Sequence, residues 1–392
     1  MRTVVSSARL ACLALLLAGA ACGSPALSGP DLGPESPATP PPPPPGPAAQ
    51  YEFGAKFEPP VGRVVHGMGQ WAAFNAKYTG LLGPGIQPAS ELMFITLADT
   101  LRPWNPAQIA ASLAKIAAAG RIPLADIALR GNQPTPAELA QLPDPLFAVD
   151  DEVAGGSKWD SRLLDLAQLF AAYKKPVLLR IGGEFNGWWN GYHPFLFPKA
   201  FRKVVNLFRA AGAANVAFVW CYEPAAPGDF ADTDASGNPK WYPGPDVVDW
   251  FSIDLFGATD VGGPVTGHGG GATSFGKTLA YLDFARAGQK PVVIAESAPS
   301  HFDLATASGA ASAWAEWFTP YFGLIAARSE IKWFTYINYD WSLASYYDDM
   351  GWKNNDLSAS PSLSALYSSE LARPKYLHAP ELSLVKDFAK YK

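Results

Sequence analysis

The chain has 392 residues, 17% of them charged, and a formal net charge of −5 at pH 7. This slightly acidic balance, with no run of basic residues, argues against nucleic acid as a partner. The 48% of hydrophobic residues and the thirteen tryptophans are enough for a large core, with aromatic side chains to spare for a binding surface.

The first residues predict an export signal. A positively charged start precedes an apolar run at residues 10–18, which is too short to cross a membrane. The small residues up to Ala20 suit an ordinary signal peptidase. The alternative is a bacterial lipoprotein box ending at Cys22, although Gly19 stands where such boxes usually have Leu. We predict a lipoprotein-like signal peptide over residues 1–22, with lipidation at Cys22.

Residues 23–50 predict a disordered linker. They are rich in Pro, Gly, Ala and Ser and include an unbroken proline run at residues 40–45. Such a sequence buries no core and stays extended, at about 3.1 Å per residue where polyproline II forms. It suits a tether on a lipid-anchored protein, with a leader on a freely secreted protein as the alternative. We expect an extracellular or outer-surface location, with membrane contact only through the N-terminal lipid.

From residue 51 to residue 392, apolar β-rich runs alternate with helical patterns. The predicted strands are residues 63–66, 92–97, 122–127, 176–181, 216–222, 250–255, 291–295 and 332–339. The predicted helices are residues 105–119, 160–173, 198–211, 274–287 and 310–328. Strand and helix repeated about eight times predict a single (β/α)8 barrel, which we expect to be monomeric.

Two glutamates close predicted strands in matching contexts. Glu184 ends the run Lys-Pro-Val-Leu-Leu-Arg-Ile-Gly-Gly-Glu, and Glu296 ends Lys-Pro-Val-Val-Ile-Ala-Glu. The carboxyl ends of barrel strands converge on one mouth, so two carboxylates there predict cleavage of a glycosidic bond. Glu184 would be the acid/base and Glu296 the nucleophile of a retaining mechanism, which requires carboxyl groups about 5–5.5 Å apart.

Strand alternation adds Arg180 to this predicted site. Arg180 shares a face with Glu184 and would lie beneath it inside the barrel, where a buried guanidinium needs an anionic partner. Alternation also places Glu296 on the face of Val292 and Ile294. Arg180 could then keep Glu296 ionised and leave Glu184 as the less charged member, which gives a nucleophile and a general acid.

Aromatic residues next to these strand ends predict sugar subsites. Trp188 and Trp189 follow Glu184, and Trp341 follows the eighth strand, where indole rings can pack on the apolar faces of sugars. Asn186 could bind a sugar hydroxyl or, equally, shape the Asn-Gly turn. Three further polar candidates are His66, Glu223 and Asp254. For each of them, structural hydrogen bonding is at least as strongly expected as a role in the site. No His or Cys motif indicates a metal site, and no cofactor is expected.

Four segments resemble glycoside hydrolase family 26, whose members are retaining enzymes with a (β/α)8 barrel: residues 175–188, 215–220, 242–256 and 290–296. In this resemblance Glu184 matches the acid/base and Glu296 the nucleophile. It implies an endo-acting hydrolase with a polysaccharide substrate. β-1,4-Mannan is the leading candidate, and mixed-linkage glucan and xylan-type chains are its competitors.

The chain departs from the family pattern near both glutamates. Gly183 stands where the family usually has His, and Phe256 replaces a Tyr whose hydroxyl bonds the nucleophile; Ser-Ala, rather than a residue and Gly, follows Glu296. Tyr222, Tyr336 or Tyr339 could supply the missing hydroxyl. These departures motivate a second hypothesis, a catalytically inactive carbohydrate-binding surface lipoprotein on the same barrel.

Overall fold

The computed structural model describes residues 50–99, 104–131, 148–265, 272–344, 347 and 350–391. The predicted signal peptide with Cys22, and the linker up to residue 49, lie outside these residues. Residues 49–392 form one compact unit. Within the described ranges, no helix has the length and apolar character needed to cross a membrane.

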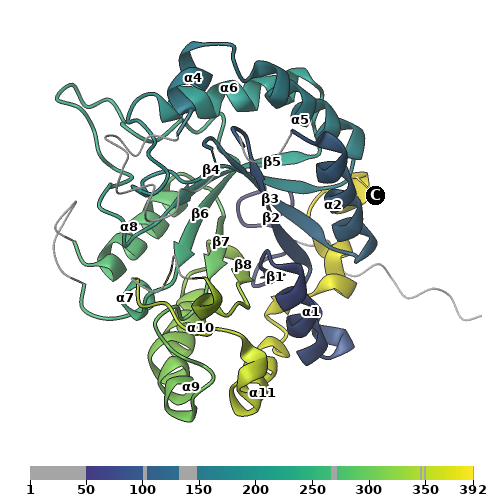
Figure 1. Cartoon of the computed structure of the whole chain (residues 1–392), viewed down its shortest axis with the longest axis vertical. Helices are drawn as coiled ribbons and strands as arrows, with labels where there is room; N and C mark the ends of the chain where they lie inside the picture. Colours follow the sequence, from purple (N-terminus) through teal and green to yellow (C-terminus); the bar gives the residue numbers. More distant parts are fainter. Residues whose placement is uncertain are drawn as a thin grey trace, which may run out of the picture. The chain divides into compact units, whose positions relative to one another are not determined.

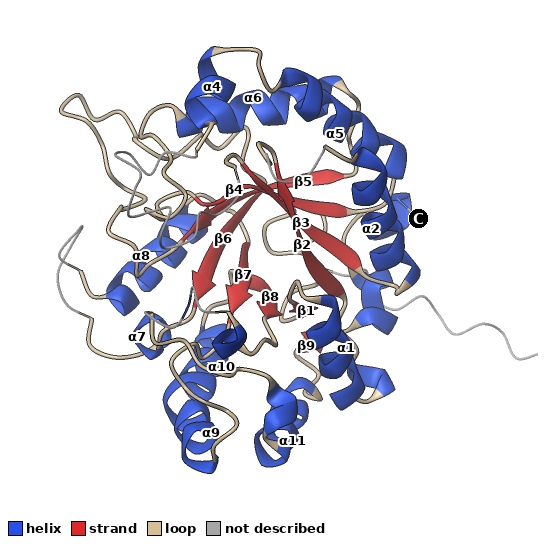
Figure 2. Ribbon diagram, viewed as in Figure 1, coloured by secondary structure: helices blue, strands red, loops and turns tan. Residues whose placement is uncertain are grey.

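Eight parallel strands form a closed barrel (Figures 1 and 2). Each strand pairs with the next one in the chain, and β1 pairs with both β8 and β2. A short strand, β9 (Tyr376–Leu377), lies beside β1. The predicted (β/α)8 fold is therefore confirmed. The eight strands are β1 (Val64–Met68), β2 (Ser90–Thr96), β3 (Ile122–Ala128), β4 (Val177–Glu184), β5 (Val216–Tyr222), β6 (Trp250–Leu255), β7 (Val292–Ser297) and β8 (Ile331–Tyr336).

Helices surround the barrel (Figure 2). All five predicted helices are present, and the one predicted at residues 310–328 consists of α9, a π-helical turn (Trp314–Phe318) and α10. The prediction missed α1, whose only buried side chains are Asn75 and Tyr78, so that it has almost no amphipathic pattern. The helices are α1 (Ala72–Leu81), α2 (Pro106–Ala118), α4 (Asp150–Gly155), α5 (Asp160–Tyr173), α6 (Phe197–Ala210), α7 (Ala258–Val261), α8 (Ser274–Ala287), α9 (Ala307–Ala313), α10 (Thr319–Ala327) and α11 (Pro361–Leu371).

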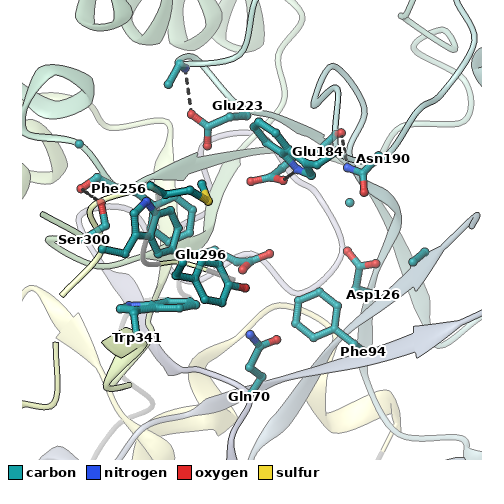
Figure 3. A pocket seen from close by; sticks show the side chains of 18 of the residues that line it. Gln70, Phe94, Asp126, Glu184, Asn190, Glu223, Phe256, Glu296, Ser300 and Trp341 are labelled. Atoms are coloured by element: carbon teal, nitrogen blue, oxygen red, sulfur yellow. Dashed lines mark hydrogen bonds between the residues drawn. The ribbon is translucent and has the colours of Figure 1, made fainter. Parts of the chain in front are cut away.

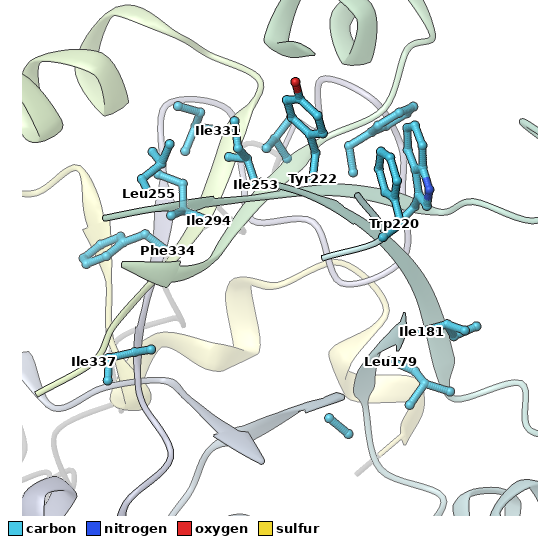
Figure 4. Close-up of a cluster of buried hydrophobic side chains, with 14 of the residues drawn as sticks. Leu179, Ile181, Trp220, Tyr222, Ile253, Leu255, Ile294, Ile331, Phe334 and Ile337 are labelled. Atoms are coloured by element: carbon cyan, nitrogen blue, oxygen red, sulfur yellow. The ribbon is translucent and has the colours of Figure 1, made fainter. Parts of the chain in front are cut away.

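The strands are buried on both faces, which explains their continuous apolar sequences. Inward side chains, among them Leu92, Leu178 and Val293, form a cluster inside the barrel. Outward side chains pack with the helices in a larger cluster, and several of them, including Leu179 and Ile294, appear in Figure 4. Each fully buried Leu or Ile contributes about 2 kcal/mol to folding. This two-sided packing fixes the strand ends that carry the polar residues.

The pairing of β6 with β7 is irregular just before Glu296. Ile253 pairs with Ile294, but the next residue, Asp254, pairs with Glu296, so β7 has one extra residue. The predicted alternation, with Glu296 on the face of Val292 and Ile294, is wrong. Those two side chains belong to the outer cluster, whereas Glu296 lines a pocket at the barrel mouth. A bulge of this kind re-aims a side chain.

β4 is also irregular just before its glutamate. Arg180 and Glu184 are four residues apart but pair with β5 residues only two apart. The intervening Gly182 and Gly183 have φ angles of 83° and 57°, in the left-handed region that glycine adopts at little cost. Both glutamates therefore follow a bulge, a feature frequent beside active sites.

Candidate active site

A pocket of about 1360 Å³ opens at the carboxyl ends of the strands (Figure 3). Both predicted catalytic glutamates, Glu184 and Glu296, line it. The pocket therefore gathers the ends of β4 and β7, as the barrel prediction required. Its titratable lining also includes Asp126, Arg130, Arg180, Glu223, Asp260 and His301.

Arg180 pairs with three carboxylates beneath the pocket. Its Nη2 lies 2.6 Å from Glu296 Oε1, its Nε 2.6 Å from Asp126 Oδ2 and its Nη1 3.0 Å from Asp254 Oδ2. Burial opposes the guanidinium charge, but these carboxylates outweigh it and raise the pKa of Arg180. The predicted pairing with Glu296 is confirmed. Because all three nitrogens have carboxylate partners, the geometry gives Arg180 a role in positioning Glu296.

Asp254 holds Glu296 from the backbone side. It is fully buried, and its Oδ1 accepts a hydrogen bond from the Glu296 backbone N–H at 2.8 Å. Burial raises the pKa of Asp254 well above its usual value, and that of Asp126 to about 6, against the opposing charge of Arg180. Glu296 is thus fixed at both its main chain and its carboxylate.

Glu184 lies in a different electrostatic setting. Trp189 Nε1 donates a hydrogen bond to Glu184 Oε2 at 2.6 Å. Burial, followed by the nearby charge of Glu296, raises the pKa of Glu184 to about 7, while Arg180 and Trp189 act in the opposite direction. Glu184 can therefore hold or release a proton near neutral pH.

The three predicted tryptophans all line the pocket. Trp188 is 54% exposed and offers an open indole face, whereas Trp341 is 2% exposed. Trp341 is held among other rings, with centroids 4.6 Å from Trp352 and 5.2 Å from Trp71. Trp188 is therefore the best placed of the three to stack on a sugar, with Trp189 engaged by Glu184.

Two predicted substrate contacts are absent from the pocket lining. Asn186 is buried; its amide donates to the carbonyls of Glu223 and Gly228 at 2.7 and 2.9 Å, and its Oδ1 accepts from the Glu223 N–H at 3.0 Å. Asn186 thus connects the loops after β4 and β5 through hydrogen bonds, which is a structural role and not a contact with a sugar. Tyr222 points outward into the apolar cluster (Figure 4), with its ring 4.9 Å from that of Tyr281, so the structure does not bring its hydroxyl to the pocket.

The polar groups expected to replace the family's tyrosine are also elsewhere. Tyr336 donates its hydroxyl to the Asn355 carbonyl at 2.8 Å, and Tyr339 stacks on Trp71 at 3.9 Å. Phe256 does line the pocket, and so does Tyr347, whose ring lies 4.8 Å from that of Trp341. Sequence reasoning missed Tyr347 because it lies in a loop after β8 with no pattern of its own.

Among the other polar candidates, Glu223 lines the pocket and His66 does not. Glu223 Oε1 accepts a hydrogen bond from the Ala225 N–H at 2.9 Å, and burial, with Asp260 and Glu184 adding to it, raises the pKa of Glu223. His66 is buried, with its Nε2 2.5 Å from the Tyr78 hydroxyl, and has a structural role. Sequence reasoning also missed Asp126, although a charged residue inside the apolar run of β3 was a usable signal.

The described residues contain one group of side chains spaced for a metal ion, Asp150, Asp151 and His193. It lies outside the pocket lining. Asp150 already accepts hydrogen bonds from the backbone N–H of His193 and pairs with its Nδ1, each at 2.9 Å. These contacts explain the group as a loop contact between α4 and the segment before α6.

Two curated relatives are similar to this chain in sequence. A β-1,3-xylanase named TXYA from Vibrio sp. is 29% identical over 254 residues, and a β-1,3-xylanase from Alcaligenes sp. is 27% identical over 249 residues. The alignments cover 59% and 57% of this chain but 51% and 49% of the relatives, so the chain spans about half the length of the curated relatives it matches. No protein-family model matches the chain.

Solved structures with the same fold include a GH26 β-mannanase from Bacteroides ovatus, with a TM-score of 0.52 at 13% identity. GH26C from Muricauda sp. gives a TM-score of 0.56 at 15% identity. Each alignment covers 84% of this chain, and 93% and 89% of the respective structures. At these identities the likeness shows the fold alone. The predicted resemblance to glycoside hydrolase family 26 is thus confirmed at the level of the fold, and in sequence the chain is similar to β-1,3-xylanases.

Proposed function

We propose that this protein is a retaining glycoside hydrolase that cleaves internal bonds of a β-linked polysaccharide. The observation that carries the proposal is the contrast between two glutamates of one pocket. Glu296 lies 2.6 Å from the Arg180 guanidinium, in an ion pair at the side of the pocket where the nucleophile is predicted. Glu184 is half-buried, and its surroundings raise its pKa to about 7, which favours its protonated form at slightly acidic pH. One carboxylate and one carboxylic acid are what double displacement requires.

In the first step, Glu184 gives its proton to the glycosidic oxygen as the C–O bond breaks. A Glu296 oxygen bonds to the anomeric carbon from the opposite face and forms a glycosyl-enzyme. This ester removes the charge of Glu296, which is one cause of the raised pKa of Glu184. The pKa of Glu184 then falls, so its carboxylate can take a proton from water. The water oxygen attacks the anomeric carbon, Glu296 leaves, and the configuration is retained.

β-1,3-Xylan is the first substrate to test, because the two relatives with the longest alignments reported above are named β-1,3-xylanases. β-1,4-Mannan, the substrate implied by the family resemblance, is the second. The β-mannanase among the solved structures supports it only through the fold, at 13% identity. The open pocket of about 1360 Å³, with the exposed Trp188 in its lining, suits a polymer chain with several sugar contacts.

We also propose that the protein acts outside the cytoplasm as a monomer held by a lipid on Cys22. The apolar run at residues 10–18 and the proline-rich linker support this location. Expression of the full chain and of Cys22→Ala in a bacterium fed labelled palmitate tests it. Label on the parent chain and none on Cys22→Ala is the expected result, and an unlabelled parent would favour free secretion.

The function is tested by reducing-end release from β-1,3-xylan, β-1,4-mannan, glucomannan, lichenan and β-1,4-xylan, with the Glu296→Ala variant in parallel. We expect release by the parent protein and none by the variant, with NMR showing retention in the first product. Binding of a glycan by a folded parent protein that releases no reducing ends would instead support the carbohydrate-binding alternative. Gly183 and Phe256 would then be the first residues to examine.

A further inference from the structure

An aromatic side chain of β2 is exposed inside the pocket. Ser90 and Leu92 point into the barrel and are 0% and 1% exposed. Phe94 continues this inward face, yet it is 42% exposed, lines the pocket and belongs to neither apolar cluster. A phenyl ring in this position leaves apolar area in water that burial would normally remove. It is therefore available to a ligand.

A carboxylate with a free oxygen lies beside this ring. Asp126 of β3 pairs in register with Phe94, and Figure 3 shows both side chains on the same side of the pocket. Asp126 Oδ2 lies 2.6 Å from Arg180 Nε, whereas Oδ1 has no hydrogen-bond partner among the described residues. Asp126 is 1% exposed and lines the pocket. A buried carboxylate oxygen normally accepts a hydrogen bond. Because Asp126 lines the pocket, a donor group of a ligand would approach Oδ1 from there.

Gly183 borders this carboxylate. A Cβ atom at residue 183 would lie 3.4 Å from Asp126 Oδ2 and 3.2 Å from Arg180 Nη2. A longer side chain there would stand over the ion pair and narrow the approach to Asp126. The backbone at Gly183, with φ 57°, also favours glycine.

We infer that Phe94 and Asp126 form a sugar-binding subsite on the β2–β3 side of the pocket. The apolar face of a pyranose packs on the Phe94 ring, and a hydroxyl at the edge of the same sugar donates to Asp126 Oδ1. A flat apolar surface beside a single acceptor matches the two kinds of surface that a neutral sugar presents. Arg180 contacts both Asp126 and Glu296, so this subsite lies next to the predicted nucleophile. The inference rests on the proposed function and names where its substrate binds.

Isothermal titration of the full chain carrying Glu296→Ala, with β-1,3-xylotetraose and β-1,4-mannotetraose as probes, tests the subsite without turnover. Adding Phe94→Ala should weaken binding about tenfold, and Phe94→Trp should keep it within about threefold of the parent. Phe195→Ala is the matched control, because Phe195 is 37% exposed and lies outside the pocket lining. It should leave the Kd unchanged. Since Phe94 is already exposed, thermal melting should show that each variant folds.

Gly183→Asn tests the carboxylate half of the subsite, because Asn tolerates a left-handed backbone and adds a side chain over Asp126. It should weaken binding at least about threefold. If the Phe94→Ala protein binds the probes as tightly as its parent, the sugar does not pack on the Phe94 ring. If the Gly183→Asn protein binds them as tightly as its parent, Asp126 does not bind a sugar hydroxyl. Neither result would contradict the proposed function. If neither probe binds the parent and no polysaccharide is cleaved, the proposed function fails and the subsite fails with it.

Discussion

The ends of β4 and β7 have nearly the same sequence pattern but differ in what surrounds their glutamates. Each strand starts after Lys-Pro, runs through apolar residues and carries its Glu at or next to its end, beyond a bulge. Glu184 follows two glycines with positive φ and accepts a hydrogen bond from a neutral indole. Glu296 is held by a guanidinium at its carboxylate and by Asp254 at its backbone N–H.

This difference shows that the two predicted roles are separated by the neighbours of each carboxylate, which for Glu296 come from other strands. Arg180 belongs to β4, the strand of Glu184, yet its Nη2 reaches Glu296 on β7. The strand of the predicted acid thus supplies the cation that pairs with the predicted nucleophile. The substitutions Glu184→Gln, Arg180→Met and Trp189→Phe each remove one part of this asymmetry, and we expect their effects to decrease in that order.

Replacing Glu184 with Gln removes the proton donor while keeping the shape of the side chain. We expect kcat on polysaccharide to fall about 10²- to 10⁴-fold, which is the usual contribution of a general acid. An aryl glycoside whose leaving group needs no protonation should still form the glycosyl-enzyme, seen as a rapid burst of phenol followed by slow turnover. Glu184→Gln activity on polysaccharide close to that of the parent would exclude the acid role.

Replacing Arg180 with Met leaves three buried carboxylates without their cation. Arg180 is 2% exposed, so its ion pairs are buried. Because breaking a buried ion pair lowers the free energy of unfolding by about 3–5 kcal/mol, we expect a loss of this size in Arg180→Met. Arg202→Met is the matched control. Arg202 pairs with Asp246 at the surface, with side chains 43% and 58% exposed, and its loss should cost about 1 kcal/mol or less. Urea denaturation compares the two, and equal losses would show that the Arg180 pairs are not special to stability.

Replacing Trp189 with Phe tests the environment of Glu184 more gently. The indole N–H stabilises the charged carboxylate, so its loss should raise the pKa of Glu184 further above its present value of about 7. Activity needs the protonated acid and falls as pH rises through this pKa. The alkaline limb of the kcat/KM profile should therefore move to higher pH in Trp189→Phe, with less than about a tenfold change at the optimum. A limb that stays in place or moves to lower pH would contradict the assignment.

Much of this architecture could be predicted from the sequence because apolar strand runs and helical periodicity are local signals. Each predicted strand overlaps an observed one, and the strand ends correctly located Glu184 and Glu296 at one mouth. The face on which Glu296 projects could not be predicted, because a bulge in β7 arises from its pairing with β6. Asp126 could have been found from its charge inside an apolar strand, whereas Tyr347 lies in a loop whose position depends on the tertiary fold.

Tyr222 is a second residue whose position could not be predicted from the sequence of its strand. All seven residues of β5 are buried, so its sequence gives no sign of which face meets the helices. Ala217 and Val219 turned out to face the barrel interior, while Trp220 and Tyr222 face outward. A tyrosine hydroxyl suggested a polar pocket, but packing of the ring among other aromatics determined its position.

Replacing Tyr222 with Phe should have the smallest effect. Its hydroxyl is buried without a hydrogen-bond partner among the described residues, so removing it should change the unfolding free energy by about 1 kcal/mol or less, in either direction. Activity should stay within about twofold, because the side chain lies outside the pocket. Tyr347→Phe is the matched comparison, since it removes the same atom from a residue that lines the pocket. We expect kcat/KM to fall several-fold in Tyr347→Phe, and a larger loss in Tyr222→Phe would return Tyr222 to the site.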